Sequence, residues 1–281
     1  MKFAKAHGTG NDFVVLPDPD GALELTPRLV AALCDRRRGI GGDGVLRVVR
    51  SAKHPEAAGL AGEAEWFMDY HNADGSIAEM CGNGVRAYVR YLASSGLIAA
   101  DTTRLDVATR AGVVPVQIGS DDLTVGLPVP IVGGESTATV AGLAYAGVAA
   151  SVGNPHLVCA VADVAALNAL DLGRPPRVDA ATFPDGVNVE FIAAGAPVAG
   201  ADRHVHMRVY ERGSGETLSC GSGACAVAAV VLRDVGMTPG TGTVAVDVPG
   251  GRLTITLDGD TCRLSGAAVV VATGEVDLTT L

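Results

Sequence analysis

The stretch MDYHNADGSIAEMCGNGVRAYVRYLASSG, Met68 to Gly96, decides the fold. A related stretch, MRVYERGSGETLSCGSGACAVAAVVLRDVG, Met207 to Gly236, follows at an offset of 139 residues. In both copies a short alternating apolar run leads into a polar, glycine-bearing loop, then Cys-Gly-x-Gly and a long segment of helical character. The chain therefore contains the same arrangement twice.

A second internal repeat supports a duplication. Gly153-Asn154 precedes an apolar strand as Gly10-Asn11 does, at an offset of 143 residues. Two repeats at similar offsets indicate a duplicated domain of about 130 residues. The segment Pro128 to Glu135, rich in Pro, Gly and small residues, is the expected crossover between the halves. We predict an α+β fold of two pseudo-symmetric domains, each a mixed β-sheet wrapped around a central helix that begins at its Cys-Gly-x-Gly.

Local patterns predict several other elements. Thr26 as an N-cap and Pro27 at the first position begin a helix that runs to about Arg37. We interpret Arg36 to Arg38 as the solvated end of that helix, and Ser51 to Glu63 as a surface loop. Near the C-terminus, strands of period two are separated by the hairpin turns Pro249-Gly-Gly and Asp258-Gly.

The composition excludes several classes of function. A net charge of −10 over 281 residues, without a basic stripe, argues against a nucleic-acid partner. The start of the chain has no apolar stretch of signal-peptide length, and no later run approaches a membrane span, so we expect a cytoplasmic protein with no membrane partner. In a chain expected to be cytosolic the six cysteines are predicted to be reduced, and the lack of a C-x-x-C pair predicts no structural metal.

Lysine is scarce, and this bears on cofactors. Only Lys2, Lys5 and Lys53 are present, and the first two lie in a strand-like start. A pyridoxal cofactor would have to form its Schiff base with one of them. The sequence therefore disfavours pyridoxal chemistry.

The Cys-Gly-x-Gly motif suggests acid–base chemistry. A cysteine at the first turn of a helix lies at the positive end of the helix dipole, and its thiolate can accept backbone N–H groups, so its acidity rises. Consecutive N–H groups at that turn can hold a carboxylate, which would place the adjacent α-carbon within reach of the sulfur. A lone copy is more often a buried cysteine at a tight turn.

The duplication changes that interpretation. A pseudo-twofold relation would bring both helix starts to one cleft, so that two thiols face one α-carbon from opposite sides. Racemisation or epimerisation requires this geometry, because one group removes a proton from one face and the other delivers a proton to the opposite face. We predict that Cys81 and Cys220 form the acid–base pair.

The two copies differ in their loops. Glu211-Arg212 aligns with Asn72-Ala73, so the loops present different groups to the substrate. A guanidinium can bind a carboxylate in bidentate fashion, and amide side chains can bind ammonium or carboxylate groups. The candidate amides lie next to Gly, Cys or strand ends: Asn11, Asn72, Asn83, Asn154 and Asn188.

Five blocks of this sequence resemble those of the diaminopimelate epimerase family, in the same order over nearly the whole chain: HGTGNDFVV, NADGSIAEMCGNGVRAYVRYL, VGNPHLV, GVNVEF and ERGSGETLSCGSGA. The resemblance implies a cofactor-independent isomerase that interconverts LL- and meso-2,6-diaminopimelate in lysine and peptidoglycan precursor biosynthesis. It also implies a homodimer and two epimerase domains, residues 1–127 plus 267–281 and residues 128–266, with the last strand returning to the first domain.

The resemblance assigns roles motif by motif. Cys81 and Cys220 become the thiol pair, and His156 and Glu211 flank and tune them. The N–H groups of Gly82-Asn83 and Gly221-Ser222 would hold the reacting carboxylate. Asn11 would help hold the α-ammonium, and the distal carboxylate would be anchored by Asn72, Asn154, Asn188 and Arg212, with Glu211 nearby.

The chain departs from the family pattern at Gly44, where many members carry a glutamine that contacts the reacting end of the substrate. A water or a backbone group would have to replace that side chain. Ser222 in place of the more usual threonine is a milder change. Two alternatives remain open: a proline or hydroxyproline racemase with the same paired thiols, and a binding protein or non-cysteine isomerase on the same fold.

Overall fold

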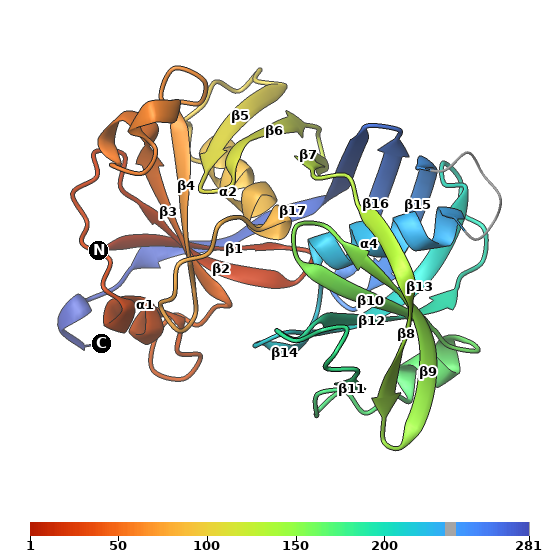
Figure 1. The fold of residues 1–281 in the computed structure, drawn as a ribbon. Helices are drawn as coiled ribbons and strands as arrows, with labels where there is room; N and C mark the ends of the chain where they lie inside the picture. Colours follow the sequence, from red (N-terminus) through yellow and green to blue (C-terminus); the bar gives the residue numbers. More distant parts are fainter. Residues whose placement is uncertain (234–239, 281) are drawn as a thin grey trace. The chain divides into compact units, whose positions relative to one another are not determined.

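The computed structural model describes residues 1–233 and 240–280, and the chain divides into two compact units (Figure 1). Unit 1 comprises Met1–Val125 and Gly266–Leu281, and unit 2 comprises Gly126–Ser265. The last residues of the second sequence copy, 234–236, lie outside the described residues. None of the described helices has the length and hydropathy needed to cross a membrane.

The elements of unit 1, in chain order, are β1 (Lys2–Gly8), β2 (Asn11–Pro17), α1 (Pro27–Cys34), β3 (Gly44–Arg50), the 3₁₀ turns η1 (Ser51–Lys53) and η2 (Ala58–Leu60), β4 (Trp66–Asn72), α2 (Gly82–Ser94), β5 (Arg104–Thr109), β6 (Gly112–Ile118), β7 (Asp122–Leu127, whose end enters unit 2) and η3 (Leu278–Thr280).

The elements of unit 2 are β8 (Ile131–Val140), β9 (Leu143–Ser151), β10 (Pro155–Ala160), α3 (Val164–Asn168), β11 (Arg177–Val178), β12 (Asn188–Ala194), β13 (Arg203–Glu211), β14 (Gly215–Thr217), α4 (Gly221–Arg233), β15 (Thr241–Val248) and β16 (Gly251–Asp258). The long strand β17 (Thr261–Glu275) begins in unit 2 and ends in unit 1.

The two units repeat one pattern of strand pairing. In unit 1, β1 is antiparallel to β2, β2 is parallel to β3, β3 is antiparallel to β4, β4 is parallel to β5, and β5 is antiparallel to β6. In unit 2 the same sequence of pairings runs through β9, β10, β12, β13, β15 and β16. The predicted duplication and the mixed character of both sheets are therefore confirmed.

Each sheet packs on one helix that begins just after a Cys. Helix α2 begins at its Cys-Gly-x-Gly, as predicted, and most of its side chains are buried, including Val85, Tyr88 and Leu92. Helix α4 is composed almost entirely of Ala and Val in its middle turns and lies in one apolar cluster with strand residues such as Met207 and Val246. A helix as apolar on all sides as α4 needs a sheet around it, whereas α2 also buries the Arg86 guanidinium, which bonds to Thr9 and Asn83.

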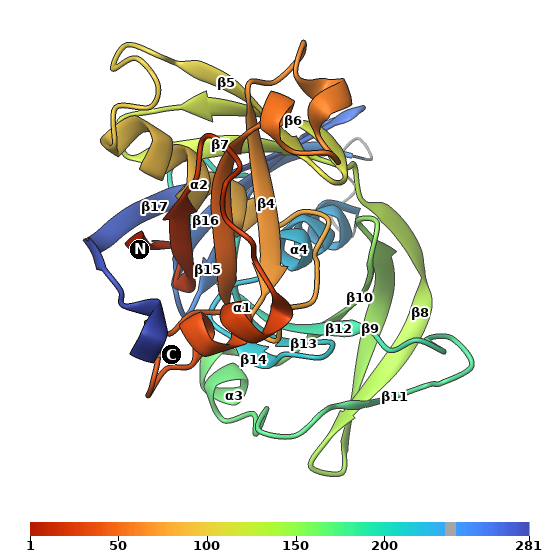
Figure 2. The same cartoon turned by 90° about the vertical axis from the view of Figure 1, so that its left-hand side faces the viewer.

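The last strand closes unit 1. Residues Lys2 to Gly8 of β1 pair with Ala268 to Glu275 of β17, with a register shift between Lys5 and Ala6. The backbone nitrogen of Met1 donates to the carbonyl of Val276 at 2.7 Å, so the two termini lie close together in both views (Figures 1 and 2). In unit 1, β1 therefore lies between β2 and the end of β17.

The predicted helix from Thr26 to Arg37 has the correct start and a wrong end. The Thr26 side chain accepts from the Leu29 N–H at 3.2 Å, but α1 ends at Cys34. Asp35 takes an extended conformation, and its carboxylate accepts from the Arg37 and Arg38 N–H groups, so it stops the helix. Our interpretation of Arg36 as a solvated helix end was therefore wrong, since Arg36 instead binds Asp12 through two hydrogen bonds.

Two loop predictions also need correction. The expected loop Ser51–Glu63 contains η1 and η2. The expected crossover Pro128–Glu135 is strand from Ile131 onward, and a register shift between Val132 and Glu135 absorbs the Gly-Gly pair that had suggested a loop.

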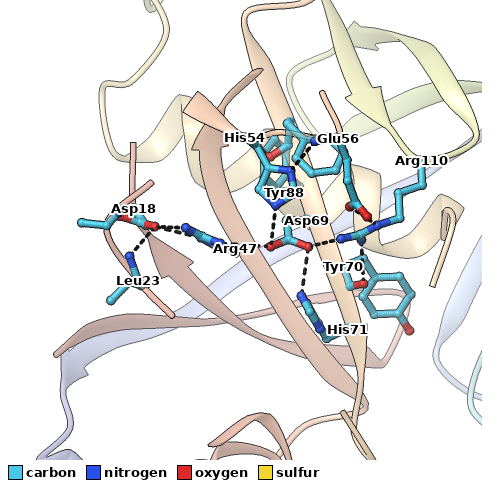
Figure 3. Close-up of polar contacts among 12 residues, drawn as sticks. Asp18, Leu23, Arg47, His54, Glu56, Asp69, Tyr70, His71, Tyr88 and Arg110 are labelled. Carbon is cyan, nitrogen blue, oxygen red and sulfur yellow. Dashed lines mark hydrogen bonds and ion pairs between the residues drawn. The ribbon is translucent and has the colours of Figure 1, made fainter. Parts of the chain in front are cut away.

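A buried polar network occupies unit 1 around Asp69 of β4 (Figure 3). The Asp69 carboxylate accepts from Arg110 at 2.6 Å, lies 2.9 Å from the His71 Nε2 and is ion-paired with Arg47 at 3.5 Å, and Arg47 also pairs with Asp18 at 2.6 Å. Burial raises the pKa of Asp69, but the hydrogen bonds and charges of His71 and Arg110 outweigh it and lower the pKa to about 2. The Asp69 carboxylate is therefore ionised within unit 1 and holds Arg110, which lies between β5 and β6, against β4.

Candidate active site

A strained hairpin brings Asn11 to the start of α2. Thr9 and Gly10, between β1 and β2, have φ values of 49° and 83°, which is the type I′ pattern of a two-residue hairpin. A threonine rarely adopts a positive φ, and here its hydroxyl accepts from the buried Arg86 guanidinium at 2.6 Å. Gly8 permits the close approach, because a Cβ at this position would lie 2.6 Å from the Asn83 carbonyl oxygen.

Cys81 is the N-cap residue of α2. Its backbone is extended, with φ −145° and ψ 119°, and its Sγ accepts from the Gly84 N–H at 3.4 Å. The thiol donates to the Asn11 Oδ1, with 3.6 Å between sulfur and oxygen. The structure thus places this predicted residue where a helix dipole and a backbone N–H both favour a thiolate.

Asp43 orients the Asn11 amide. Its Oδ2 accepts from the Asn11 Nδ2 at 2.7 Å and from the Asp12 N–H at 3.2 Å. Because a carboxylate only accepts, the amide nitrogen must face Asp43, so the amide oxygen faces Cys81 and accepts from Asn83 at 3.3 Å. Sequence analysis did not select Asp43, although its place in the glycine-rich turn before β3 was a usable signal.

The predicted residue Asn72 is bonded within its own loop. Its side chain donates to the Ser76 Oγ at 3.0 Å, and its backbone N–H donates to the Ser76 carbonyl at 2.9 Å. In the β3–β4 register Asn72 pairs with Gly44. A Cβ at Gly44 would lie 2.5 Å from the His71 carbonyl oxygen and 2.7 Å from the Tyr70 ring, so this ring occupies the space where a glutamine side chain would begin.

Cys220 occupies the equivalent position before α4 in unit 2. Its Sγ accepts from the Gly223 N–H at 3.4 Å and lies 3.6 Å from the Ser222 Oγ, and the residue is 5% exposed. Burial, together with the charges of Glu211 and Glu190, raises the pKa of the Cys220 thiol well above its usual range. In this environment Cys220 carries its proton.

A buried Glu–His pair supports this end of the helix. The His156 Nδ1 lies 2.7 Å from the Glu190 Oε1, and both side chains are fully buried. The His156 Nε2 lies 3.0 Å from the Asn154 Oδ1, and the Asn154 Nδ2 donates to the Ser222 Oγ at 3.4 Å. Polar contacts therefore run without a break from Glu190 through His156, Asn154 and Ser222 to the thiol of Cys220.

Sequence analysis missed Glu190. The sequence did hold a signal for it: Glu190 stands between Val189 and Phe191 in a buried strand and lies on the same face as Asn188, two residues before it. A glutamate on a buried strand needs a polar partner. Gly223 is needed beneath it, since a Cβ there would lie 2.5 Å from the Glu190 Oε1. The second glycine of this Cys-Gly-x-Gly thus makes room for a carboxylate of the same unit.

The remaining predicted residues of unit 2 form two groups. The Glu211 carboxylate accepts from Thr217, and burial raises its pKa, although the hydrogen bonds from Thr217 and Cys220 act in the opposite direction. Asn188 accepts from the Arg212 N–H at 2.9 Å, and the Arg212 guanidinium donates to the Asp185 carbonyl at 3.0 Å. Glu211 is therefore hydrogen-bonded to the Cys220 thiol, and Asn188 is hydrogen-bonded to Arg212.

Solved structures with this fold come from a class of proteins that includes epimerases. A Bacillus anthracis phenazine biosynthesis protein of the PhzF family matches with a TM-score of 0.76 and 18% identity, covering 98% of both chains. A hydroxyproline epimerase from Agrobacterium vitis, with bound trans-4-hydroxy-L-proline, matches with a TM-score of 0.66 and 15% identity, covering 98% of this chain and 91% of that chain. At such identities the likeness concerns the fold, and the predicted fold class is confirmed.

Sequence comparison defines the family. The profile of the family described as diaminopimelate epimerase matches residues 3–130 and 148–279. The chain is 54% identical over 286 residues to the diaminopimelate epimerase of Streptomyces coelicolor, covering 99% of this chain and 96% of that protein. It is 48% identical over 292 residues to the diaminopimelate epimerase of Mycolicibacterium smegmatis, covering 99% of this chain and 97% of that protein. The chain belongs to the diaminopimelate epimerase family.

Proposed function

We propose that this protein is an isomerase that interconverts LL- and meso-2,6-diaminopimelate in lysine biosynthesis and thereby supplies a peptidoglycan precursor. The observation that carries the proposal is the full-length identity of 54% to a diaminopimelate epimerase. The cysteine at the start of the central helix in each unit provides the chemistry that such a reaction needs.

The proposed reaction uses two thiols and balances without a redox step. The thiolate of one cysteine removes the α-proton, and the electron pair of the C–H bond remains on carbon. The thiol of the other cysteine then protonates the carbanion on the opposite face, so one residue gains a proton and the other loses one. The raised pKa of Cys220 favours its protonated form, which is the form that can donate a proton.

We assign the substrate contacts by residue type. Backbone N–H groups of a first helical turn have no partner within the helix, so Gly82-Asn83 and Gly221-Ser222 would hold the reacting carboxylate. Asn11 would accept from the α-ammonium through the amide oxygen that Asp43 directs toward Cys81. The distal carboxylate would be bound by Arg212 with Asn72, Asn154 and Asn188.

We assign supporting roles to His156 and Glu211 and add Glu190 and Asp43. Glu211 and Glu190 act on Cys220 through their charges, and His156 connects Glu190 to the polar chain that ends at Ser222. Asp43 acts through Asn11. The reaction as proposed uses only side chains and backbone groups of the protein and needs neither pyridoxal nor a metal.

We further propose that the two compact units are the two epimerase domains and that the protein acts as a cytoplasmic homodimer. The strand pairing repeated in the two units and the family resemblance support the first statement. The resemblance supports the second. Light scattering on the purified protein would test the dimer, and a mass of one chain would contradict it.

A substrate panel tests the proposed function. Purified protein should convert LL-diaminopimelate to the meso form under reducing conditions, as followed by chiral chromatography, and should leave L-proline and trans-4-hydroxy-L-proline unchanged. Turnover of the cyclic substrates alone would favour the racemase alternative. Activity that survives complete alkylation of Cys81 and Cys220 would favour a scaffold that does not use its thiols.

A further inference from the structure

Two histidines and an aspartate gather on the outer face of the unit 2 sheet. His204 and His206 are two residues apart on β13, where Val205 and Met207 point into the apolar cluster with α4. Side chains alternate between the faces of a strand, so both histidines lie on the face opposite α4. Asp247 of β15 lies directly beside His206 in the parallel register and shares that face.

The three side chains are close enough to share one ion. One donor atom from each residue lies within 4.8 Å of the others. The His204 Nε2 lies 2.9 Å from the Asp247 Oδ2, and the two imidazole rings have centroids 5.0 Å apart. Ligands bound about 2.1 Å from a zinc ion lie about 3 to 3.5 Å from one another, so the first pair is already near that spacing.

The surroundings of His204 fix its orientation. Its Nδ1 lies 2.6 Å from the Ala196 carbonyl oxygen and therefore carries a hydrogen. Gly195 makes room for the ring, since a Cβ at this glycine would lie 2.4 Å from the Nδ1. The His204 side chain is only 6% exposed. A histidine that donates one ring nitrogen to a carbonyl and presents the other is typical of metal ligands, because the first contact sets the tautomer.

The contact between His204 and Asp247 requires a cation. With a hydrogen on Nδ1, the neutral ring presents a lone pair from Nε2, and this lone pair faces a carboxylate oxygen at 2.9 Å. Two acceptors at that distance repel unless a proton or a metal ion lies between them. His206 beside the pair supplies a third ligand, which a proton would not use.

We propose that His204, His206 and Asp247 form a binding site for a divalent transition-metal ion of the zinc class. Two imidazoles and a carboxylate are ligands that such ions accept. The site lies outside the proposed epimerase chemistry, and the sequence prediction of no structural metal considered only cysteine spacing. A bound ion would join β13 to β15, stabilise unit 2 and keep coordination positions for water.

Arg252 of β16 competes with the ion. It lies opposite Asp247 in the antiparallel register, and its guanidinium donates to both carboxylate oxygens at 2.6 and 2.8 Å. The Arg252 side chain is half exposed, so it can leave the carboxylate without opening the core. Removing this guanidinium should therefore strengthen metal binding, whereas removing a ligand should weaken it.

Cobalt(II) is the appropriate probe, because its absorption spectrum distinguishes the proposed site from binding to cysteines. A thiolate ligand gives Co²⁺ a charge-transfer band, whereas nitrogen and oxygen ligands give none. We expect one Co²⁺ per chain by calorimetry, no thiolate band, and a rise in melting temperature. His206→Ala and Asp247→Asn should each weaken binding by about 10- to 100-fold or more, the size of loss seen even for residues that only support a ligand. Arg252→Ala should tighten Co²⁺ binding, and Arg263→Ala, which removes a partly exposed arginine of β17, should leave it unchanged.

Circular dichroism of each apo variant separates loss of binding from loss of fold. If the wild type bound no Co²⁺, the proposal would be overturned, and the contact between His204 and Asp247 would be explained by a proton instead of a metal ion. Equal binding to the wild type and to both ligand variants, or a thiolate band, would also overturn it and assign the metal to cysteines.

Discussion

Replacement of Glu190 by glutamine tests whether the buried Glu–His pair acts on the Cys220 thiol. Glu190→Gln keeps the shape of the side chain above Gly223 and can still accept from His156. A hydrogen bond to a charged group contributes about 1.5–3 kcal/mol and a neutral one about 0.5–1.5 kcal/mol, so the free energy of unfolding should fall by about 1 kcal/mol. The melting temperature should fall by about 2–4 °C.

The catalytic effect should exceed the effect on stability. Because Glu190 acts through His156, kcat should fall about tenfold, equivalent to about 1.4 kcal/mol, with KM nearly unchanged. The charge of Glu190 raises the pKa of Cys220, so its removal lowers that pKa. The limb of the pH profile of kcat/KM that reports Cys220 should therefore move to lower pH.

Steady-state kinetics across pH, with circular dichroism for folding, would measure these changes. Glu216→Gln is the matched control, because Glu216 is a partly exposed glutamate of the same unit that pairs with Arg208 at 2.7 Å. It should change neither kcat nor the pH profile. If Glu190→Gln lost stability but kept the wild-type kcat and pH profile, Glu190 would be purely structural and the reasoning would fail.

Three further predictions follow from other parts of the molecule. Since the pKa of Asp69 is held at about 2, its charge should contribute about 2 kcal/mol of stability that is present above about pH 4 and lost as the pH falls toward 2. In urea unfolding, the free energy of unfolding of Asp69→Asn should therefore fall less over that pH range than that of the wild type. Gly44→Gln should lower the melting temperature and the activity, because its Cβ would meet the Tyr70 ring and the His71 carbonyl oxygen and such overpacking costs about 1–3 kcal/mol of stability. A variant with the wild-type melting temperature and activity would contradict this prediction. Mild oxidant should join Cys81 and Cys220 in a disulfide and inactivate the enzyme reversibly, whereas finding both thiols free by mass spectrometry after inactivation would contradict this.

The duplication and the helix starts could be predicted from the sequence because their causes are local. A Cys-Gly-x-Gly followed by a long, largely apolar segment specifies both the N-terminus of α2 and its hydrophobic environment, and α2 begins where predicted. The repeat of that pattern then predicts a second copy without any knowledge of strand order.

The residues that were missed depend on long-range contacts. Glu190 and Asp43 act through His156 and Asn11, which are more than thirty residues away in the chain. The role of Arg36 was likewise misjudged, because its guanidinium binds Asp12, which is 24 residues away in the chain. Period and propensity define each strand, but they do not specify which polar side chains the sheet register brings together.

The most direct test of the two-thiol account is deuterium uptake at the α-carbon. LL-diaminopimelate incubated with the reduced enzyme in deuterated water should gain deuterium at one α-carbon as it becomes the meso form, because each proton delivered comes from a solvent-exchanged thiol. Cys81→Ala and Cys220→Ala should each abolish epimerisation, whereas Cys34→Ala should not, since burial raises the pKa of the Cys34 thiol to about 11 and keeps it protonated. Absence of deuterium from the product, or full activity in either of the first two variants, would contradict the account.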